Sequence, residues 1–459
     1  MSSSSSPEQG SPASPTFAVT SPADILSYIP HALGFMPVES LVVLTTDGRR
    51  LGATLRVDLP SAEADPLAFA EGVLSFLQGD TAADGVLLAV YTSEGWPQLA
   101  PPPRNALVLN VEAVLGAAGL PVRGGWFVSD HAWRDYFCTD DECCPWPGHT
   151  LDEVRDSPLN AELIFGGSAF DSSASIAVLR AAPFITGRME SSEVDTQAIE
   201  DAQAEYAASC SGRWDSAVQF RATSSFWDAV LERPGELPEG MEPAVAAFLL
   251  ASLESRTVRD FLLVSACIGS DAALEGAASC GLIGSVRPVE SRADEGDPVE
   301  RPVLPAVRRA GALRSAVDAV LAAGAPPVEQ LAATLLRVGE EGTGRDAAVL
   351  YADILAGRYT GEIRWKRVDH MTGILARLVA VSSGESRAAA LTMSGWFEYA
   401  RGRGSRAAVL LDAAEAAVPG YRLARLLQEL LRRGGLPAWA RSRSTAWTSS
   451  APRSPSRAA

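Results

Sequence analysis

The sequence predicts an α/β N-terminal half, with a mixed sheet and flanking helices, followed by an all-α C-terminal half. Two observations indicate this division. Apolar strand-like runs alternate with helical periodicity over the first part of the chain, and from about Val194 onward long Ala/Leu/Arg/Glu segments with a 3.6-residue repeat replace them. Strand, helix and strand in succession are typical of an α/β sheet with some parallel pairing.

A short helix and a hairpin are expected first. Residues 21–28 begin with Ser-Pro and carry an aspartate in the first turn, which favours a helix that Pro30 then stops. The β-branched and aliphatic runs 41–45 and 51–57 flank Asp47-Gly48, a dipeptide that favours a tight turn. We therefore expect two antiparallel strands joined by this turn.

A helix and a further strand are expected after the hairpin, which gives the order strand, helix, strand. Residues 66–77 place apolar side chains at helical spacing, and residues 86–91 form a continuous apolar run that is typical of a buried strand. The series continues with a predicted helix over 106–120 and an extended segment over 125–129. Parallel pairing of these later strands is expected, because a helix connects them.

Near the C-terminus, residues 387–401 and 405–417 are expected to form two antiparallel helices, with a third over 421–433. Small and aromatic residues in this region resemble a tetratricopeptide-like helical hairpin. They are Trp396, Tyr399, Ala400, Gly404, Ala407, Ala413, Ala417 and Pro419. One such unit is no array, and ordinary packing of a helical bundle explains the same residues, so both interpretations stay open.

Changes in composition divide the chain into six parts. The ends are rich in Ser and Pro and lack the apolar periodicity of a core, and a charged stretch with three prolines separates two helical regions. We expect a disordered N-terminal segment (1–20), an α/β domain (21–190), a helical middle region (191–290), a linker (291–305), a helical C-terminal domain (306–440) and a disordered tail (441–459).

Charge and hydropathy exclude several classes of partner. The 56 acidic and 39 basic side chains give a net charge of -17, so the folded protein is expected to repel a phosphate backbone, and we expect no nucleic acid partner. Only the tail after Glu429 is rich in arginine. No apolar run reaches the roughly 20 residues of a membrane-spanning helix, and the first 15 residues lack a secretory signal, so a cytoplasmic location is expected.

A cluster of cysteines is the best candidate for chemistry. Cys138 is followed by the adjacent pair Cys143 and Cys144, with His131 upstream and His149 downstream. Thiolate sulfur and imidazole nitrogen are the ordinary ligands of tetrahedral zinc. A zinc site formed by these five residues is therefore one interpretation of the pattern.

The spacing leaves two other interpretations of the cysteine loop open. Adjacent cysteines project in different directions from an extended backbone, and zinc-binding pairs usually have two to four residues between them. The acidic run at residues 140–142 would stabilise a cation, but it would raise the pKa of the thiols in the absence of one. The alternatives are a redox-active or nucleophilic thiol and a structural loop with buried thiols.

Arg56 and Asp58 form a second candidate, this time for ligand binding. They lie two residues apart at the end of a predicted strand, so they share one face of it. Together they could hold an anion or a polar ligand. They could equally form an ion pair with each other, which is common at strand ends and contributes little stability.

Three motifs carry a resemblance to a known family. They are residues 33–43 (LGFMPVESLVV), residues 56–60 (RVDLP), and Trp133 with Cys138 and the Cys-Cys-Pro run at 143–145. Together they resemble a bacterial family catalogued as domain of unknown function 4192 (DUF4192). The resemblance runs from about Ser21 to about Trp439, and it implies no particular activity.

The function that the sequence favours is a cytoplasmic binding or regulatory protein. Phosphate loops, dinucleotide fingerprints, nucleophile elbows and His-Glu-x-x-His motifs do not occur in it. In this interpretation the α/β half senses a small ligand or anchors an assembly, and the C-terminal helices bind another protein. The alternative is an enzyme or metal-binding protein that uses the cysteine-rich loop at residues 131–149, and a purely structural role also stays open.

Overall fold

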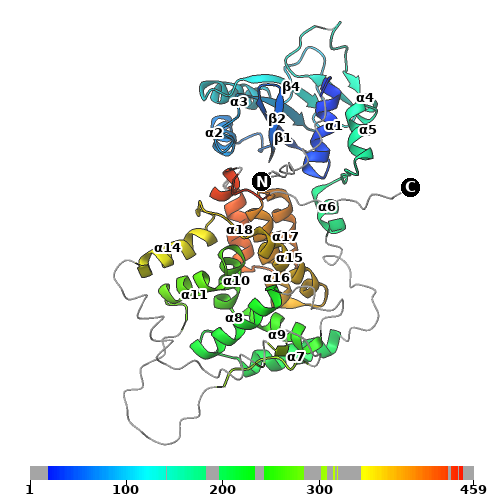
Figure 1. Cartoon of the computed structure of the whole chain (residues 1–459). Helices are drawn as coiled ribbons and strands as arrows, with labels where there is room; N and C mark the ends of the chain where they lie inside the picture. The colour runs from blue at the N-terminus through cyan, green and yellow to red at the C-terminus, as the bar shows by residue number, and fades with distance from the viewer. Residues whose placement is uncertain are drawn as a thin grey trace, which may run out of the picture. The chain divides into compact units, whose positions relative to one another are not determined.

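The computed structural model describes residues 19–140, 142–181, 196–232, 242–283, 301–307, 314–315, 318, 343–432, 436–442 and 444–447. These residues form two compact units, whose elements are shown in Figure 1. The first unit, here called the α/β unit, extends to Ser173 but lacks Ser75–Thr81. The second, here called the helical unit, contains Ser75–Thr81 and the described residues from Ala174 onward.

The α/β unit is built on a six-stranded mixed sheet with the strand order β2-β1-β3-β4-β5-β6. Strands β3 and β4 pair in parallel, and the other neighbours are antiparallel. The strands are β1 (Ser40–Asp47), β2 (Arg50–Asp58), β3 (Gly85–Tyr91), β4 (Val122–Val128), β5 (Ala132–Asp135) and β6 (His149–Thr150). The predicted mixed sheet is confirmed.

The hairpin at the start of the sheet forms where turn chemistry predicted it. Strands β1 and β2 meet at the Asp47-Gly48 turn, where Asp47 faces Arg50 and Gly48 has a φ of 60°. The carboxylate of Asp84 accepts a hydrogen bond from the backbone N–H of Gly48 at 2.9 Å, so the turn is fastened to the start of β3. Strand β1 is almost entirely buried, because it lies between β2 and β3 in a sheet that has helices on both faces.

Helices cover both faces of this sheet. Figure 1 shows α2 and α3 on one side of the strands and α1, α4 and α5 on the other. These helices are α1 (Pro22–Leu33), α2 (Pro66–Leu77), α3 (Asn105–Ala117), α4 (Leu151–Arg155) and α5 (Pro158–Phe165). Side chains from α1 and α4 pack against the same cluster as Trp126 and Trp133 of the sheet.

The first helix begins as predicted but ends later. Ser21 and Asp24 form a reciprocal capping box at its start. The helix continues past Pro30 to Leu33, and the prediction that Pro30 stops it was wrong. The chain stays helical for three residues after Pro30, and Gly34, in a left-handed conformation, closes the last turn by donating to the carbonyl oxygen of Pro30 at 2.7 Å.

The second unit is helical, as predicted. Its helices are α6 (Ala174–Ala181), α7 (Thr196–Ser209), α8 (Ala217–Glu232), α9 (Pro243–Glu254), α10 (Arg256–Ile268), α11 (Ser270–Ser279), α14 (Thr343–Leu355), α15 (Trp365–Ala380), α16 (Gly384–Ala400), α17 (Gly404–Ala417) and α18 (Arg422–Arg432). Residues 245–253 of α9 are all buried, which places this helix at the centre of the core. None of the described helices has the length and apolarity required to cross a membrane.

Helices α16 and α17 are the pair expected near the C-terminus. They pack closely because a small residue lies at their contact. A Cβ atom at Gly395 would come within 3.0 Å of the Leu411 side chain. The third expected helix is α18. The resemblance of this region to a tetratricopeptide hairpin stays a prediction.

Segments around the helices make specific contacts where the structure describes them. Val303, at the end of the predicted linker, exchanges two hydrogen bonds with the side chain of Gln219 on α8. Residues 291–300 and the N-terminal residues 1–18 lie outside the described residues. The tail predicted over 441–459 is described only as far as Trp447, whose ring lies 4.1 Å from the Arg403 guanidinium carbon.

Just before that tail, Trp439 is fully buried, its ring lies 6.2 Å from Trp396, and its Nε1 donates to the carbonyl oxygen of Ala400 at 2.8 Å. We predict that Trp439→Ala lowers the unfolding free energy of the helical unit by about 3–5 kcal/mol, because it leaves a cavity and an unpaired carbonyl. Chemical denaturation measures this. The control Leu109→Ala, at a half-exposed position on α3, should change stability by less than about 0.5 kcal/mol. Equal effects of the two substitutions would contradict the prediction.

Candidate metal centre

The cysteine loop connects the last two strands of the sheet. Strand β5 pairs with β6 through the partners Ala132–Thr150 and Trp133–His149, so the intervening residues 136–148 leave and return at the same end of a two-stranded ribbon. This return is what brings the two ends of the loop together. The loop is therefore attached to the sheet at both ends.

Local hydrogen bonds fold the first half of the loop. The Oδ1 atom of Asp135 accepts hydrogen bonds from the backbone N–H groups of Phe137 and Cys138, both at 2.9 Å. Further along, the N–H of Cys144 donates to the carbonyl oxygen of Asp140 at 2.8 Å. These bonds turn the chain between Cys138 and Cys144 instead of extending it.

This turn brings three thiols together. The Sγ atoms of Cys138, Cys143 and Cys144 all lie within 4.8 Å of one another. Sulfurs bound to one tetrahedral zinc ion at about 2.3 Å lie roughly 3.8 Å apart, so a small inward movement would complete the geometry. The adjacency of Cys143 and Cys144 is no obstacle, because residues 142–144 form a turn. Among the described residues, this is the one such group of His, Cys, Asp or Glu.

The three thiols differ in exposure. Cys144 is buried, Cys138 is partly buried and Cys143 is exposed. The cluster therefore has one side in the protein and one side in solvent, so an ion could enter from solvent and still be held by a buried ligand.

The protonation of Cys143 and Cys144 disfavours nucleophilic chemistry. Burial, with Cys138 close by, raises the pKa of Cys144 to about 12. A hydrogen bond and the charge of Cys138 raise the pKa of Cys143. Both thiols are therefore protonated at neutral pH, which leaves few thiolates for attack on a substrate. A thiophilic cation would displace these protons.

An arginine attaches the loop to the rest of the α/β unit. The guanidinium carbon of Arg134 lies 5.4 Å from the ring of Trp96 and 5.2 Å from that of Trp146, which follows the cysteine pair closely. Its Nη1 donates to the carbonyl oxygen of Pro145 at 3.5 Å, and the residue is buried. Nearby, the hydroxyl of Tyr136 donates to the carbonyl oxygen of Pro103 at 2.6 Å. These contacts hold the loop against the β3–α3 connection.

Sequence reasoning missed Arg134, Trp96 and Trp146 as positioning residues for the loop. The spacing of Trp146 after the cysteines was visible in the sequence. Its contact with an arginine on β5 and a tryptophan after β3 depends on the tertiary fold, however. No local pattern indicates that contact.

Neither candidate histidine joins the three sulfurs. His131 lies exposed in the turn between β4 and β5, and its backbone N–H donates to Ser129 Oγ at 3.3 Å. His149 stacks on Trp133 with ring centroids 4.4 Å apart, and its Nδ1 lies 3.4 Å from a carboxylate oxygen of Glu153. The structure thus brings together three of the five predicted ligands.

The other predicted site residues, Arg56 and Asp58, contact each other. Arg56 Nη2 forms an ion pair with Asp58 Oδ1, and Arg56 Nε donates to Ser40 Oγ at 2.8 Å. The guanidinium carbon also lies 6.0 Å from the ring of Phe35. Arg56 therefore joins β1 and β2 near the sheet edge, which agrees with the ion-pair interpretation of the two residues.

Gly148 returns the loop to β6 with a φ of 139°, and a Cβ atom there would lie 2.6 Å from the carbonyl oxygen of Trp133. We predict that Gly148→Ala costs about 2–3 kcal/mol of stability and opens the β5–β6 pairing, because it adds a backbone clash to an unfavourable φ. Hydrogen exchange at the amides of Trp133 and His149, which are partners across β5 and β6, measures the opening.

Gly119 is the matched control for this substitution. It has a φ of 82° and no heavy atom within 4 Å of a built Cβ, so Gly119→Ala adds the unfavourable φ without the clash. Faster exchange at the two strand amides in Gly148→Ala alone would support the account. Unchanged exchange in Gly148→Ala would show that the loop does not depend on this return.

Comparison with protein families places these features in a wider group. The family model described as domain of unknown function (DUF4192) matches residues 22–277 and 273–438. The first match contains the cysteine loop, and the second contains α18. Searches of curated proteins and of solved structures gave no match.

Proposed function

We propose that this chain, which belongs to the DUF4192 family, is a zinc-binding protein whose ion is held by Cys138, Cys143 and Cys144. The observation that supports the proposal is the convergence of the three sulfurs within 4.8 Å. Zinc is the ion best suited to several clustered thiolates in a protein, because it prefers sulfur and nitrogen ligands in a tetrahedral arrangement.

The cluster supplies three of four tetrahedral positions. The fourth is open to a water molecule, a small ligand or another residue of the chain. We favour a binding or regulatory role over catalysis. Neither His131 nor His149 belongs to the group, so neither is placed to act there as a base. Bound metal would fix the conformation of the loop between β5 and β6.

A reducing compartment is the setting that this function requires. Three thiols within 4.8 Å of one another would form disulfides under oxidising conditions, and that reaction would compete with metal binding. We therefore place the working protein in the cytoplasm. The six cysteines, all free thiols in the structure, are compatible with this location.

The first test is the zinc content of the full-length protein purified without chelator. We predict close to one zinc per chain, and a loss of most of it in Cys143→Ser and Cys144→Ser, because a hydroxyl is a poor zinc ligand. Elemental analysis gives the stoichiometry. Absorption after replacement with cobalt reports whether sulfur is bound.

Cys280→Ser is the matched control, because Cys280 is an exposed thiol of the helical unit. It should retain full zinc content. A metal-free wild-type protein that also fails to bind added zinc would sink the proposal, and so would equal zinc loss in all three variants.

Zinc affinity should depend steeply on pH. The pKa values of Cys143 and Cys144 are raised, so at neutral pH binding must release their protons into solution. Lowering the pH from about 7.5 to about 6.5 is therefore expected to weaken binding by more than about tenfold. Competition with a chromogenic chelator at each pH measures this dependence. A pH-independent affinity would show that thiols are not the ligands.

A further inference from the structure

The charge of this chain is unevenly distributed. Residues 421–459 contain eight arginines and one glutamate, which is a net charge of +7, whereas the whole chain carries -17. Helix α18 lies at the start of this basic segment, and the structure describes every residue of the helix. A basic helix on an acidic protein calls for an explanation beyond solubility.

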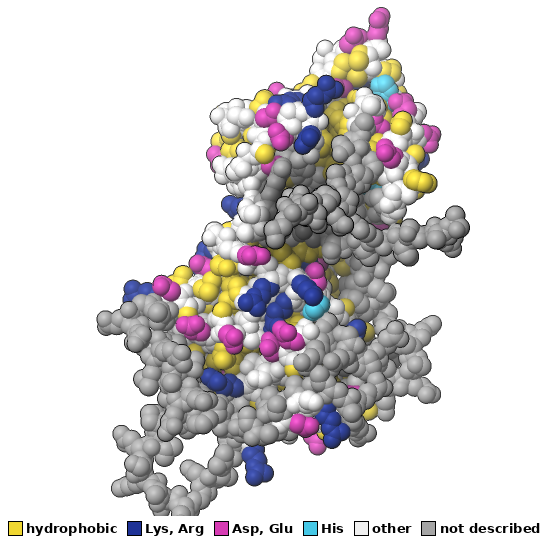
Figure 2. Space-filling view, viewed as in Figure 1, with side chains coloured by type: hydrophobic (Ala, Val, Ile, Leu, Met, Phe, Trp, Pro, Cys, Tyr) yellow, Lys and Arg dark blue, Asp and Glu magenta, His cyan; other side chains and the backbone are white. Residues whose placement is uncertain are grey.

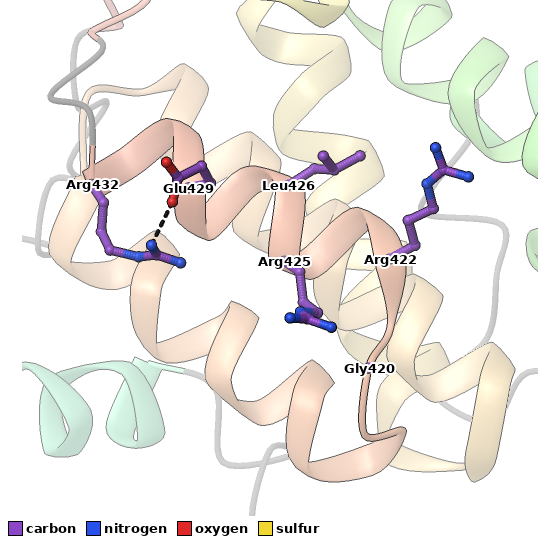
Figure 3. Close-up of a pocket in the computed structure, with 6 residues that line it drawn as sticks. All are labelled: Gly420, Arg422, Arg425, Leu426, Glu429 and Arg432. Carbon is purple, nitrogen blue, oxygen red and sulfur yellow. Dashed lines mark hydrogen bonds and ion pairs between the residues drawn. The ribbon is translucent and has the colours of Figure 1, made fainter.

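One face of α18 packs on the helical unit and the opposite face is open. Ala424 and Leu427 are buried in the core, and Leu423, Leu430 and Leu431 pack against it. The open face carries Arg422, Arg425, Leu426, Glu429 and Arg432, and these five residues are called the α18 stripe below. Figure 3 shows their side chains projecting from the helix, with Gly420 in the loop before it.

Two of the three arginines of the stripe have an ion-pair partner. Arg425 Nε lies 3.9 Å from a carboxylate oxygen of Glu415 on α17, and Arg432 pairs with Glu429 within the stripe itself. Arg422 makes no ion pair with any residue that the structure describes. Exposed pairs of this kind contribute little stability, so these guanidinium groups can exchange partners at low cost.

An apolar side chain lies in the middle of the stripe. Leu426 is 56% exposed, one of the more exposed large hydrophobic residues of the described chain. It lies between Arg422 and Glu429 on the helix surface, because residues three and four apart are neighbours there. A partner must therefore offer both carboxylates and an apolar contact.

We infer that the α18 stripe binds an acidic segment of a partner protein, with carboxylates opposite Arg422, Arg425 and Arg432 and an apolar side chain against Leu426. Guanidinium groups recognise carboxylates through paired hydrogen bonds. The stripe is about 16 Å long, which matches roughly three turns of a partner helix. The inference is independent of the metal centre.

A nucleic acid fits this surface less well. Leu426 would face the phosphate backbone, where an exposed apolar side chain gains nothing. On the face of the molecule shown in Figure 2, acidic and basic side chains are interspersed, and the described residues there form no continuous basic surface. A short acidic peptide needs only the stripe, because salt screens the acidic body beyond roughly 8 Å.

The test uses the full-length protein and a fluorescein-labelled peptide of about fifteen residues in which Glu and Leu recur at helical spacing. Fluorescence anisotropy at physiological salt measures its affinity. The variant carrying Arg422→Gln, Arg425→Gln and Arg432→Gln together should bind about tenfold more weakly. Leu426→Ser should weaken binding independently, and because the side chain is exposed this substitution leaves the fold intact.

The matched control carries Arg49→Gln, Arg50→Gln and Arg345→Gln, which remove the same charge at exposed positions outside α18. It should change the affinity by less than about twofold. Failure of the wild-type protein to bind the peptide, or equal weakening by both triple variants, would overturn the inference. Stronger binding of a single-stranded oligonucleotide or of anionic phospholipid vesicles through the same arginines would also overturn it.

Discussion

The pairing of β5 with β6 is the constraint on which the candidate metal centre depends. Only two pairs of residues make this contact, Ala132–Thr150 and Trp133–His149. They nevertheless hold the two ends of the loop next to each other. Because the loop leaves and returns at the same place, its first and second halves lie close together. Gly148 permits the return, because a side chain there would collide with the carbonyl oxygen of Trp133.

The same closure explains why the loop has a defined interior. Arg134 is buried, and the rings of Trp96 and Trp146 both lie close to its guanidinium, so their quadrupoles stabilise this desolvated cation. Beside this anchor, the neighbouring Cys138 and burial raise the pKa values of Cys143 and Cys144, so both thiols are neutral. Exchange of their protons for a cation would therefore change the charge of the loop without requiring a new fold.

Much of the fold followed from local patterns in the sequence. The hairpin depended on Asp47-Gly48, whose turn preference is a property of two residues, and α2 occupies the same range, 66–77, that its periodicity predicted. Strand β6 has two residues, too few for a periodic signal. Helix α1 continues past Pro30 and ends at the Gly34 cap, so the proline alone did not locate the end of the helix.

The site was predictable in its chemistry and less so in its geometry. Residue type alone singled out the five His and Cys candidates. Which of them meet depends on hydrogen bonds that Asp135 and Asp140 accept from backbone N–H groups, because these bonds turn the backbone so that the two adjacent cysteines lie close to Cys138. The stacking of His149 on Trp133 is a cross-strand contact, and it directs the imidazole to a different neighbour. Such contacts follow from the tertiary fold and have no local signature.

X-ray absorption fine structure at the zinc edge of the metal-loaded protein tests the central claim most directly. The geometry predicts three sulfur scatterers at about 2.3 Å and one lighter atom at about 2.0–2.1 Å, and it predicts that the sulfur shell shrinks in Cys144→Ser. A shell made only of nitrogen and oxygen, or one unchanged by that substitution, would contradict the assignment of the three cysteines as ligands.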